Sequence, residues 1–399
     1  MGRLPTFIVI ALFLLAAIHY YLWARLIRDP RLPPRLRPIA TTLLFLLAAS
    51  PPVALVLGRG HPGARRLLSW PAFLWMGIMF LLFVALLSTD LARLLFGLGR
   101  RAIGALSEAA PPPTAAPRLS LRRTFLARGV AAGTSLAVTG LTLSAIRSAR
   151  GPIGVRKVRV RLDRLPAAQD GFTIAQITDV HVGATIGRTF VEDIVRHTND
   201  LSPDLIAITG DLVDGPVEQL GHLVEPLRNL RARHGVFFVS GNHEYFSAPE
   251  GWFDELPRLG IRVLRNERLS IGNAAASFDL AGIDDRSAIH YGGLGPRQAL
   301  AQALSGRDPQ RELVLLAHQP SVVVEAEPFG VGLQLSGHTH GGQIWPFGLL
   351  VRLQQPFIAG LHRRGDSQVY VSCGTGYWGP PMRLGAPPEI TQLRLERTV

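Results

Sequence analysis

Five short motifs in this sequence combine side chains that bind catalytic metal ions. They supply carboxylates, imidazoles and a carboxamide, the mixture of ligands that a pair of hydrolytic metal ions needs. The strongest motif is Gly337-His338-Thr339-His340, which comes last in the chain. The others are Asp179-Val180-His181, Gly210-Asp211-Leu212-Val213-Asp214, Gly241-Asn242-His243-Glu244 and the single His318. Together the motifs predict a metal-dependent hydrolase.

The chemistry of these ligands narrows the choice of metal. A bridging carboxylate can hold two ions about 3.5–4 Å apart, so that a shared water is deprotonated near neutral pH and becomes the attacking group. Imidazole and carboxylate ligands without thiolate favour Mn, Fe or Zn over Cu(I) or an iron–sulfur cluster. We therefore expect two divalent metal ions as the cofactor.

The motifs stand at the ends of short apolar runs. Runs of about five Val, Ile, Leu and Phe residues bounded by Gly or Pro are typical of buried strands. They cover residues 172–177, 205–208, 236–239, 313–316 and 331–335, and helical patterns lie between them, for example over 217–233 and 296–304. Open α/β sheets place their sites at the carboxyl ends of strands. The sequence thus predicts an α/β domain over residues 151–399 with its site at the strand ends.

The residues, their spacing and their order over roughly 170–395 resemble the calcineurin-like metallophosphoesterase superfamily. Gly337 to Gln343 and the tail Gly374 to Ile390 look like those of its bacterial membrane-associated branch, which includes YkuE and YaeI. The resemblance implies a four-layer αββα sandwich and hydrolysis of phosphate ester or pyrophosphate bonds. Asp214 stands where purple acid phosphatases keep a metal-binding tyrosine, which argues against that branch.

The roles known in this superfamily imply a division of the ligands between two ions. Asp179, His181 and His340 would hold one ion, Asn242, His318 and His338 would hold the other, and Asp211 would bridge both.

His243 matches no ligand position in the superfamily. We expect it to protonate or stabilise the leaving oxygen, with Asp214 orienting its ring and Glu244 outside the ligand set. A structural role is expected for the histidines outside the motifs, His197, His222, His234, His290 and His362. Packing is the more ordinary role for a further set of residues that could also line a substrate cleft, Tyr245, Trp252, Tyr377, Trp378 and Arg383.

The first 150 residues have the pattern of a membrane domain. Apolar runs over 6–23, 39–58, 70–89 and 129–146 are about as long as a helix needs to cross a hydrocarbon core of about 30 Å. Pro51-Pro52 interrupts the second run, and Gly, Ser and Thr dilute the fourth. Residues 109–117, with three consecutive prolines, read as a linker. We therefore expect about four transmembrane helices before the α/β domain.

The distribution of arginines predicts the direction in which these spans cross the membrane. Five lie between the first and second runs, three between the second and third, and seven between the third and fourth. The positive-inside rule then places the first and third connections in the cytoplasm and the catalytic domain outside a multi-pass cell-membrane protein. Arg122-Arg123 followed by Phe125-Leu126 resembles an internal twin-arginine export signal, which implies the twin-arginine translocase as a partner. Ordinary positive-inside charge is the alternative explanation.

The charge of the chain argues against a nucleic-acid partner. The formal net charge is +13, but residues 1–150 hold 18 arginines and 3 acidic residues, which leaves 24 basic and 26 acidic residues for the α/β domain. A nucleic-acid-binding domain would carry the basic excess itself. The single cysteine, Cys373, excludes an intrachain disulfide, and its apolar neighbours indicate a buried small residue.

Taken together, the sequence predicts a membrane-bound, extracytoplasmic metallophosphoesterase, with lipid phosphate esters and pyrophosphates as candidate substrates. The alternative is a membrane sensor or transporter-associated protein that uses the phosphoesterase domain as a binding module. All seven expected ligands are present, which favours catalysis over a binding role. The first three runs lack intramembrane charge, the usual mark of a transport pathway.

Overall fold

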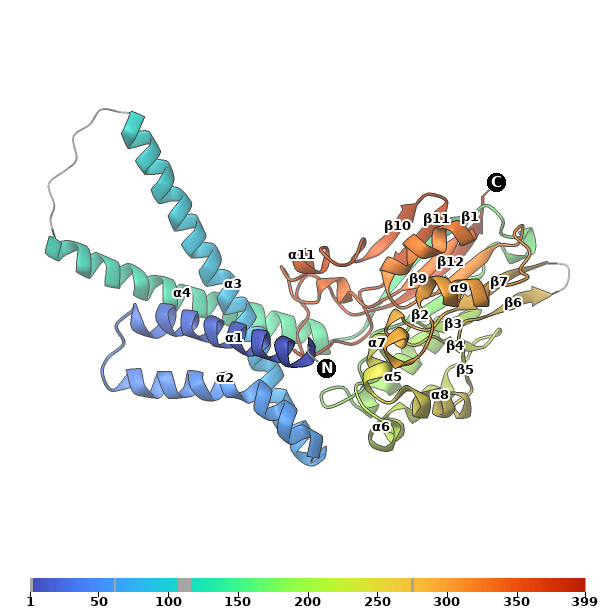
Figure 1. Ribbon diagram of the computed structural model, residues 1–399, viewed down its shortest axis with the longest axis horizontal. Helices are drawn as coiled ribbons and strands as arrows, with labels where there is room; N and C mark the ends of the chain where they lie inside the picture. The colour runs from blue at the N-terminus through green and yellow to red at the C-terminus, as the bar shows by residue number, and fades with distance from the viewer. Residues whose placement is uncertain (1–2, 61, 107–115, 274–275, 399) are drawn as a thin grey trace. The chain divides into compact units, whose positions relative to one another are not determined.

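The computed structural model describes residues 3–60, 62–106, 116–273 and 276–398 (Figure 1). The chain divides into two compact units, Met1–Ser144 and Ala145–Val399. The division falls inside one long helix, so the last residues of this helix belong to the C-terminal unit.

Long apolar helices make up the N-terminal unit. α1 (Arg3–Trp23) continues as a π-helical turn (Ala24–Arg28), and α2 (Leu36–Gly60), α3 (Pro62–Leu106) and α4 (Ala116–Arg150) follow. Among the described residues, four segments are long and apolar enough to cross a membrane: Val9–Arg28, Leu36–Ala54, Leu67–Gly104 and Leu121–Arg150. Each overlaps one of the four predicted spans, so the prediction of four apolar helices is confirmed.

Two details of the N-terminal unit differ from the sequence-based expectation. Pro51 and Pro52 lie inside α2 and do not end it, which membrane helices tolerate because neighbouring groups satisfy the freed carbonyls. Residues 116 and 117, at the end of the predicted linker, belong to α4. Residues 109–115 of that linker lie outside the described residues.

The C-terminal unit contains two mixed six-stranded sheets. The first has the order β1 (Gly154–Leu162), β12 (Glu389–Arg397), β2 (Thr173–Ile177), β3 (Leu205–Ile208), β4 (Val236–Phe238) and β5 (Ile261–Val263). The second has the order β10 (Gly360–Arg364), β11 (Ser367–Val371), β9 (Leu333–Ser336), β8 (Leu313–Leu316), β7 (Ala276–Gly282) and β6 (Glu267–Asn273). The neighbours β2, β3 and β4 run parallel in the first sheet, as do β9, β8 and β7 in the second.

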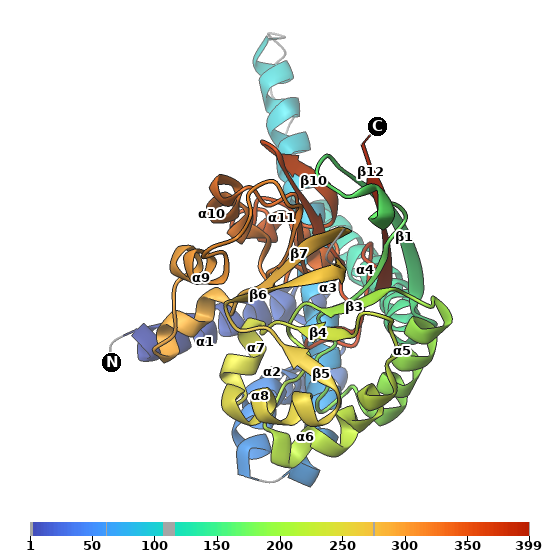
Figure 2. The same cartoon turned by 90° about the vertical axis from the view of Figure 1, so that its right-hand side faces the viewer.

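Helices pack on the outer faces of both sheets, α5 (Arg188–Asp200), α6 (Val217–Val224) and α8 (Pro249–Arg258) on the first and α9 (Pro296–Ala303) and α10 (Val323–Ala326) on the second. The short helices α7 (Asn242–Phe246) and α11 (Gly348–Val351) lie in the loops after β4 and β9. Short 3-10 helices lie at Ala167–Gln169, Glu225–Asn229, Arg286–Tyr291, Pro320–Val322, Glu327–Phe329 and His340–Gly342. Figure 2 shows α9 and α10 on one side of the strands and α5 and α6 on the other.

Alternating side chains explain the layers. In β3, Leu205 and Ala207 enter the core between the sheets, whereas Ile206 and Ile208 pack toward α5 and α6. In β8, Val314 and Leu316 enter the same central core, and the alternate leucines pack with α9 and α10. Because successive strand residues face opposite sides, fully apolar runs are needed where both faces are buried. The predicted αββα sandwich is confirmed.

One predicted helix is shorter than its apolar pattern. The pattern predicted a helix over 217–233, but α6 ends at Val224 and a 3-10 helix follows over Glu225–Asn229. Pro226 accounts for the change, since its ring cannot occupy an α-helix interior without losing a hydrogen bond and clashing with the preceding turn.

Candidate metal centre

The five motifs all follow parallel strands at one edge of the two sheets. Asp179 and His181 come after β2, Asp211 after β3 and Asn242 after β4, in the first sheet. His318 comes after β8, and His338 and His340 come after β9, in the second sheet. The site is therefore assembled where the carboxyl ends of strands from both sheets meet, as expected for an α/β site.

The backbone of these loops is unusually strained. Asp179, His181, Asp211, His338 and His340 all have positive φ, between 51° and 70°. Non-glycine residues adopt this left-handed region rarely, at a cost of order 1–3 kcal/mol each, and such residues cluster at functional sites. The loops also pack closely against these carboxylates: a Cβ at Gly337 would overlap the carboxylate of Asp179, and a Cβ at Gly241 would overlap that of Asp211.

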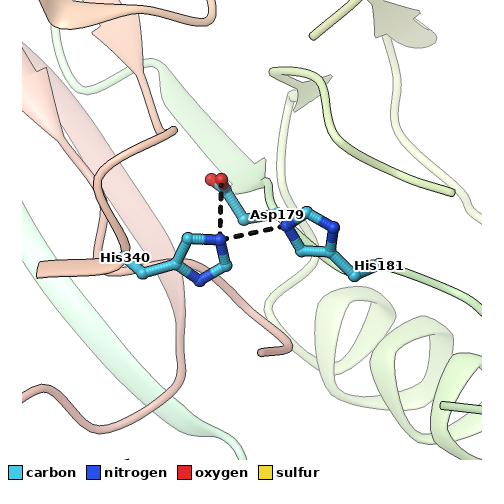
Figure 3. A group of neighbouring side chains, drawn as sticks. All are labelled: Asp179, His181 and His340. Carbon is cyan, nitrogen blue, oxygen red and sulfur yellow. Dashed lines mark hydrogen bonds and ion pairs between the residues drawn. The ribbon is translucent and has the colours of Figure 1, made fainter. Parts of the chain in front are cut away.

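Asp179, His181 and His340 form the first group of potential ligands. Figure 3 shows the three side chains turned toward one another. His340 Nε2 lies 3.0 Å from His181 Nε2 and 3.3 Å from Asp179 Oδ1. Two hydrogen bonds from the His338 backbone N–H, 2.9 and 3.0 Å long, hold the Asp179 carboxylate in place.

Asp211, His318 and His338 form the second group. Asp211 Oδ2 lies 3.2 Å from His318 Nε2, and His338 Nδ1 lies 3.2 Å from the same histidine nitrogen. Asp211 Oδ2 is also 3.8 Å from His181 Nε2, a member of the first group. One carboxylate oxygen therefore reaches toward both groups.

Hydrogen bonds at Nδ1 of His318 and His181 leave the Nε2 lone pairs of these rings directed toward the other potential ligands. His318 Nδ1 lies 2.8 Å from the Thr209 carbonyl and His181 Nδ1 lies 2.8 Å from Asp214 Oδ1, so both Nδ1 atoms must carry the hydrogen and donate it. The Nε2 atoms are then unprotonated in the neutral rings and can bind metal, the arrangement found in metal-bound histidines.

Asn242 supplies a further indication that metal fits here. Its Oδ1 is buried and accepts no hydrogen bond from the residues that the structure describes. Both chain neighbours of Asn242 touch Asp211. Gly241 packs against the Asp211 carboxylate, and the His243 backbone N–H donates to Asp211 Oδ1 over 2.8 Å. A buried, unpaired carbonyl oxygen is costly unless another partner binds it. The residues present fit two divalent ions.

His243 lies beside the first group and shares a partner with it. Its Nδ1 donates to Asp214 Oδ1 over 2.7 Å, the same oxygen that accepts from His181, and the rings of the two histidines are 4.6 Å apart. His181, Asp211 and His243 also satisfy the geometry of a metal-binding group. The structure thus places His243 beside the candidate ligands, with its ring hydrogen-bonded to Asp214.

Charges are strongly coupled at this site. Burial opposes ionisation of Asp211, but His318 and His243 outweigh it and hold the pKa of this carboxyl well below its ordinary value. Burial also opposes charge on His243, yet Asp211 and Asp214 raise the pKa of that imidazole to about 9. The two carboxylates therefore favour the protonated form of His243.

Glu244 holds the loop that carries Asp211. Its oxygens accept from the backbone N–H groups of Asp211, Leu212 and Gly241, over 3.0, 2.7 and 2.6 Å. Burial and the nearby Asp211 raise the pKa of Glu244 to about 7. Glu244 thus orders the loops after β3 and β4, in agreement with the expectation that it lies outside the ligand set.

Most of the residues considered as cleft lining are buried instead. Tyr245, Trp252 and Tyr377 are core residues, and Arg383 is 1% exposed. Trp378 alone of this set is open to solvent, at 53%, and its ring lies 5.6 Å from His243. Sequence reasoning missed Phe246, which is 65% exposed and also meets the His243 ring, at 5.5 Å. Its position three residues after His243, at helical spacing, was the available signal.

The fold and the paired ligand groups define a two-sheet metallohydrolase. Residues 172–342 match the sequence profile of the calcineurin-like phosphoesterases. A relative from Danio rerio, described as a transmembrane protein with metallophosphoesterase domain, is 35% identical over 395 residues, which cover 94% of this chain and 86% of the relative. The chain belongs to the calcineurin-like phosphoesterase family and is a metallophosphoesterase.

Other relatives refine the expected branch. A Bos taurus protein of the same description is 37% identical over 372 residues, covering 89% of this chain and 77% of the relative. YkuE of Bacillus subtilis, described as an uncharacterized metallophosphoesterase, is 30% identical over 247 residues, covering 60% of this chain and 84% of YkuE. The likeness to YkuE is confirmed, but a bacterial branch is too narrow, because the vertebrate matches are long enough to include membrane-spanning segments.

Proposed function

We propose that this chain hydrolyses phosphate ester or pyrophosphate bonds at a dinuclear metal centre. The observation that supports the proposal is the approach of Asp211 Oδ2 to ligands of both groups, 3.2 Å from His318 and 3.8 Å from His181. In this proposal Asp179, His181 and His340 hold one ion, Asn242, His318 and His338 hold the other, and Asp211 bridges them. Imidazole, carboxylate and amide ligands suit Mn, Fe or Zn.

The residues around the ligands supply the remaining chemistry. When bound, two divalent ions would lower the pKa of a shared water and neutralise charge on the phosphoryl oxygens. Asp214 engages Nδ1 of His243, which leaves Nε2 to give a proton to the leaving oxygen. The rings of Trp378 and Phe246 lie next to this imidazole and would exclude water from it as the leaving group departs.

We further infer that the enzyme works at the outer face of the cell membrane. The four candidate spans attach the catalytic unit to a bilayer, and the arginine distribution favours an extracytoplasmic position for it. Arg122 and Arg123 lie in helix α4, ahead of most of its apolar part, where a twin-arginine translocase would read them. Phospholipid, isoprenoid or glycolipid phosphates are the substrates that such a location favours.

Polar side chains inside the candidate spans bear on the alternative function, as a sensor or a transport-associated binding module. The spans include Arg25 and Asp90, whose side chains pair over 2.8 Å, and a buried histidine, His19. Both nitrogens of His19 are engaged, Nδ1 with the Leu15 carbonyl and Nε2 with the Trp75 N–H. A neutral ring with both positions satisfied is a packing element of the helices, which argues against a proton pathway through it.

The experiment that tests the proposed function is an assay of the purified full-length chain with added Mn²⁺ or Zn²⁺. The panel contains a soluble phosphomonoester, a soluble phosphodiester, a pyrophosphate and a lipid phosphate in detergent. Metal-dependent release of phosphate or alcohol from at least one class is expected, and chelation should abolish it. Retention of the metals without turnover of any class would favour the binding-module alternative.

A further inference from the structure

An ordered apolar loop lies directly after the last metal-binding motif. The loop runs from Trp345 to Leu353 and includes α11, and five of its large apolar side chains are exposed. Exposed fractions reach 66% for Trp345, 63% for Leu349 and 80% for Leu353, and Phe347 and Leu350 are also exposed. Contiguous apolar side chains facing water mark an interaction surface. We call these five residues the apolar rim.

The apolar rim is fixed to the candidate metal centre through Gln343. This side chain donates from Nε2 to the Trp378 carbonyl over 2.9 Å and accepts at Oε1 from the Trp378 backbone N–H over 2.9 Å. The Trp345 backbone N–H donates to the Leu384 carbonyl over 2.9 Å, which fastens the start of the rim to the same tail. The rim therefore begins five residues after His340, and Gln343 ties its start to Trp378, which meets His243.

Internal hydrogen bonds keep the rim in shape. The backbone N–H groups of Leu350 and Leu353 donate to the carbonyls of Phe347 and Leu350, over 2.9 and 3.1 Å. Gly342 and Gly348 approach so closely that a side chain at Gly342 would overlap the Gly348 backbone. The apolar groups are thus presented by a folded loop, and covering them would not require the loop to rearrange.

The sequence of the rim and of its flanks carries arginines but no carboxylate. From Pro328 to Gly365 the sequence contains no acidic residue, whereas Arg352 and Arg363 are exposed there. Apolar and aromatic side chains mixed with arginines and free of carboxylates suit the interface of a membrane that contains anionic lipids. Trp at the edge of such a patch fits the same position, because its ring is apolar and its N–H stays in contact with water.

A short connection joins the catalytic unit to a candidate membrane span. The candidate span Leu121–Arg150 is continuous in sequence with the catalytic unit, and only residues 151–153 separate α4 from β1. So short a connection keeps the effective concentration of lipid around the unit high.

We propose that the apolar rim is a membrane-binding surface, which seats the catalytic unit on an anionic bilayer and opens the metal centre to phosphate groups at the lipid interface. The proposal rests on the proposed phosphoesterase function, for which it names the substrate class: amphiphiles whose phosphate lies at the membrane surface. Trp378 and Phe246, whose rings both lie next to His243, would contact the apolar part of such a substrate.

Fluorescence quenching tests the surface without requiring any turnover. The full-length chain and Trp345→Phe are placed in nanodiscs of phosphatidylcholine and phosphatidylglycerol, with and without lipids brominated on the acyl chains. The difference between the two proteins reports Trp345. We expect bromolipids to quench this tryptophan, and acrylamide to reach it less in nanodiscs than in detergent. Quenching by acrylamide alone, with no effect of bromolipid, would overturn the proposal.

Kinetics test the link to the substrate. Leu349→Ser with Leu353→Ser is compared with a matched control, Val155→Ser with Val324→Ser, which removes two exposed apolar side chains elsewhere on the unit. The rim variant should lose about tenfold or more in kcat/KM on phosphatidic acid in nanodiscs, because interfacial binding scales with the apolar area inserted. Its kcat/KM on a soluble phosphate ester should stay within about twofold of the parent. The control should match the parent on both.

The outcomes separate this inference from the proposed function. If the rim variant equals the parent on lipid, or loses activity equally on lipid and soluble ester, the membrane-binding role is refuted while the hydrolase stands. If the parent cleaves neither substrate with metal bound, the proposed function fails, and the quenching result still decides where the rim lies. Crosslinking of paired chains that the rim variant abolishes would show instead that a second copy covers the rim, and would refute the proposal.

Discussion

The guanidinium of Arg383 lies 3.1 Å from Nδ1 of His340, on the side of the imidazole away from Asp179 and His181. Arg383 also donates to the backbone carbonyls of His340, Cys373, Ala386 and Gly376. Its own backbone N–H donates to the Ala145 carbonyl near the end of α4, over 2.9 Å. Burial lowers the pKa of Arg383 to about 10, so the group remains charged at neutral pH. One buried side chain thus holds the loop of His340 against the C-terminal tail.

Arg383→Met should destabilise the catalytic unit and loosen one metal. Each buried acceptor left without a donor costs about 1–3 kcal/mol, so several such carbonyls should lower the melting temperature by about 5 °C or more. Metal analysis should show less than two ions per chain, because His340 is no longer held. Arg383→Lys should recover part of both losses. Arg258→Met, at an exposed surface pair with Glu255, is the control. Unchanged melting and full occupancy in Arg383→Met would contradict this role.

Asp211→Asn should remove one or both ions and abolish turnover. An amide at this position cannot supply the negative charge that two adjacent cations need. Elemental analysis of the purified protein measures the loss. Asp193→Asn is a suitable control, since Asp193 lies on α5 in an exposed pair with Arg196. Asp284 would not serve as a control, because it is buried and its carboxylate accepts hydrogen bonds from Arg265 and Asn266. Two fully retained ions in an inactive Asp211→Asn chain would refute the bridging role.

His243→Ala should keep both ions and lose activity according to the leaving group. An alkyl leaving oxygen needs a proton, and general-acid catalysis contributes about 10²–10⁴-fold to its departure. Nitrophenolate leaves as a stable anion, so the loss of activity on p-nitrophenyl phosphate should be about 10²-fold smaller than the loss on an alkyl ester. The ratio of kcat/KM for an alkyl and an aryl ester measures the effect. Equal losses accompanied by loss of metal would show that His243 acts as a ligand in the group with His181 and Asp211.

Cys373 should react slowly with alkylating reagents. Burial raises the pKa of its thiol to about 11 from an ordinary value of 9.0, so the thiolate becomes abundant only as the pH rises toward about 11. At pH 7.5 the folded chain should be alkylated about 100-fold more slowly than the chain unfolded in guanidinium, because only the thiolate attacks. The rate should increase about tenfold per pH unit from pH 7 to 9.5. A plateau near pH 9 would show an ordinary thiol.

Arg122→Lys with Arg123→Lys should trap the catalytic unit in the cytoplasm. The substitution keeps the positive charge that orients the spans but removes the arginine pair that the translocase would read. Protease added to bacterial spheroplasts should digest residues 151–399 of the parent chain and spare them in the variant. Equal digestion of the two chains would remove the twin-arginine assignment. Protection of the parent would reverse the whole proposed orientation.

Much of the architecture could be predicted from local pattern. Runs such as Leu205 to Ile208 are apolar on both faces, which in an α/β chain means a strand covered on both sides, and each run stops at a polar motif. The long apolar helices before residue 150 follow from length and composition alone. The family could be recognised for the same reason, since its motifs are short, contiguous and anchored to strand ends.

Other features depended on contacts that sequence spacing does not encode. His181 and His340 are 159 positions apart, yet their Nε2 atoms lie within 3.0 Å because β2 and β9 end at the same edge of two packed sheets. Asp214 was expected to orient His243, but its sharing between His243 and His181 appears only in three dimensions. The same is true of Arg383, whose pattern gave no sign of burial against His340.

By itself, then, the sequence determined the element types, the candidate ligands and the apolar spans, because these depend on periodicity, residue chemistry and length within one segment. Only the tertiary structure decided how closely the candidate ligands approach one another, that Tyr245 and Trp252 are core residues rather than cleft lining, and that Trp345 to Leu353 form an exposed apolar loop beside the site. Such properties are set by packing between segments far apart in the chain, where the fate of a side chain depends on what the fold places against it.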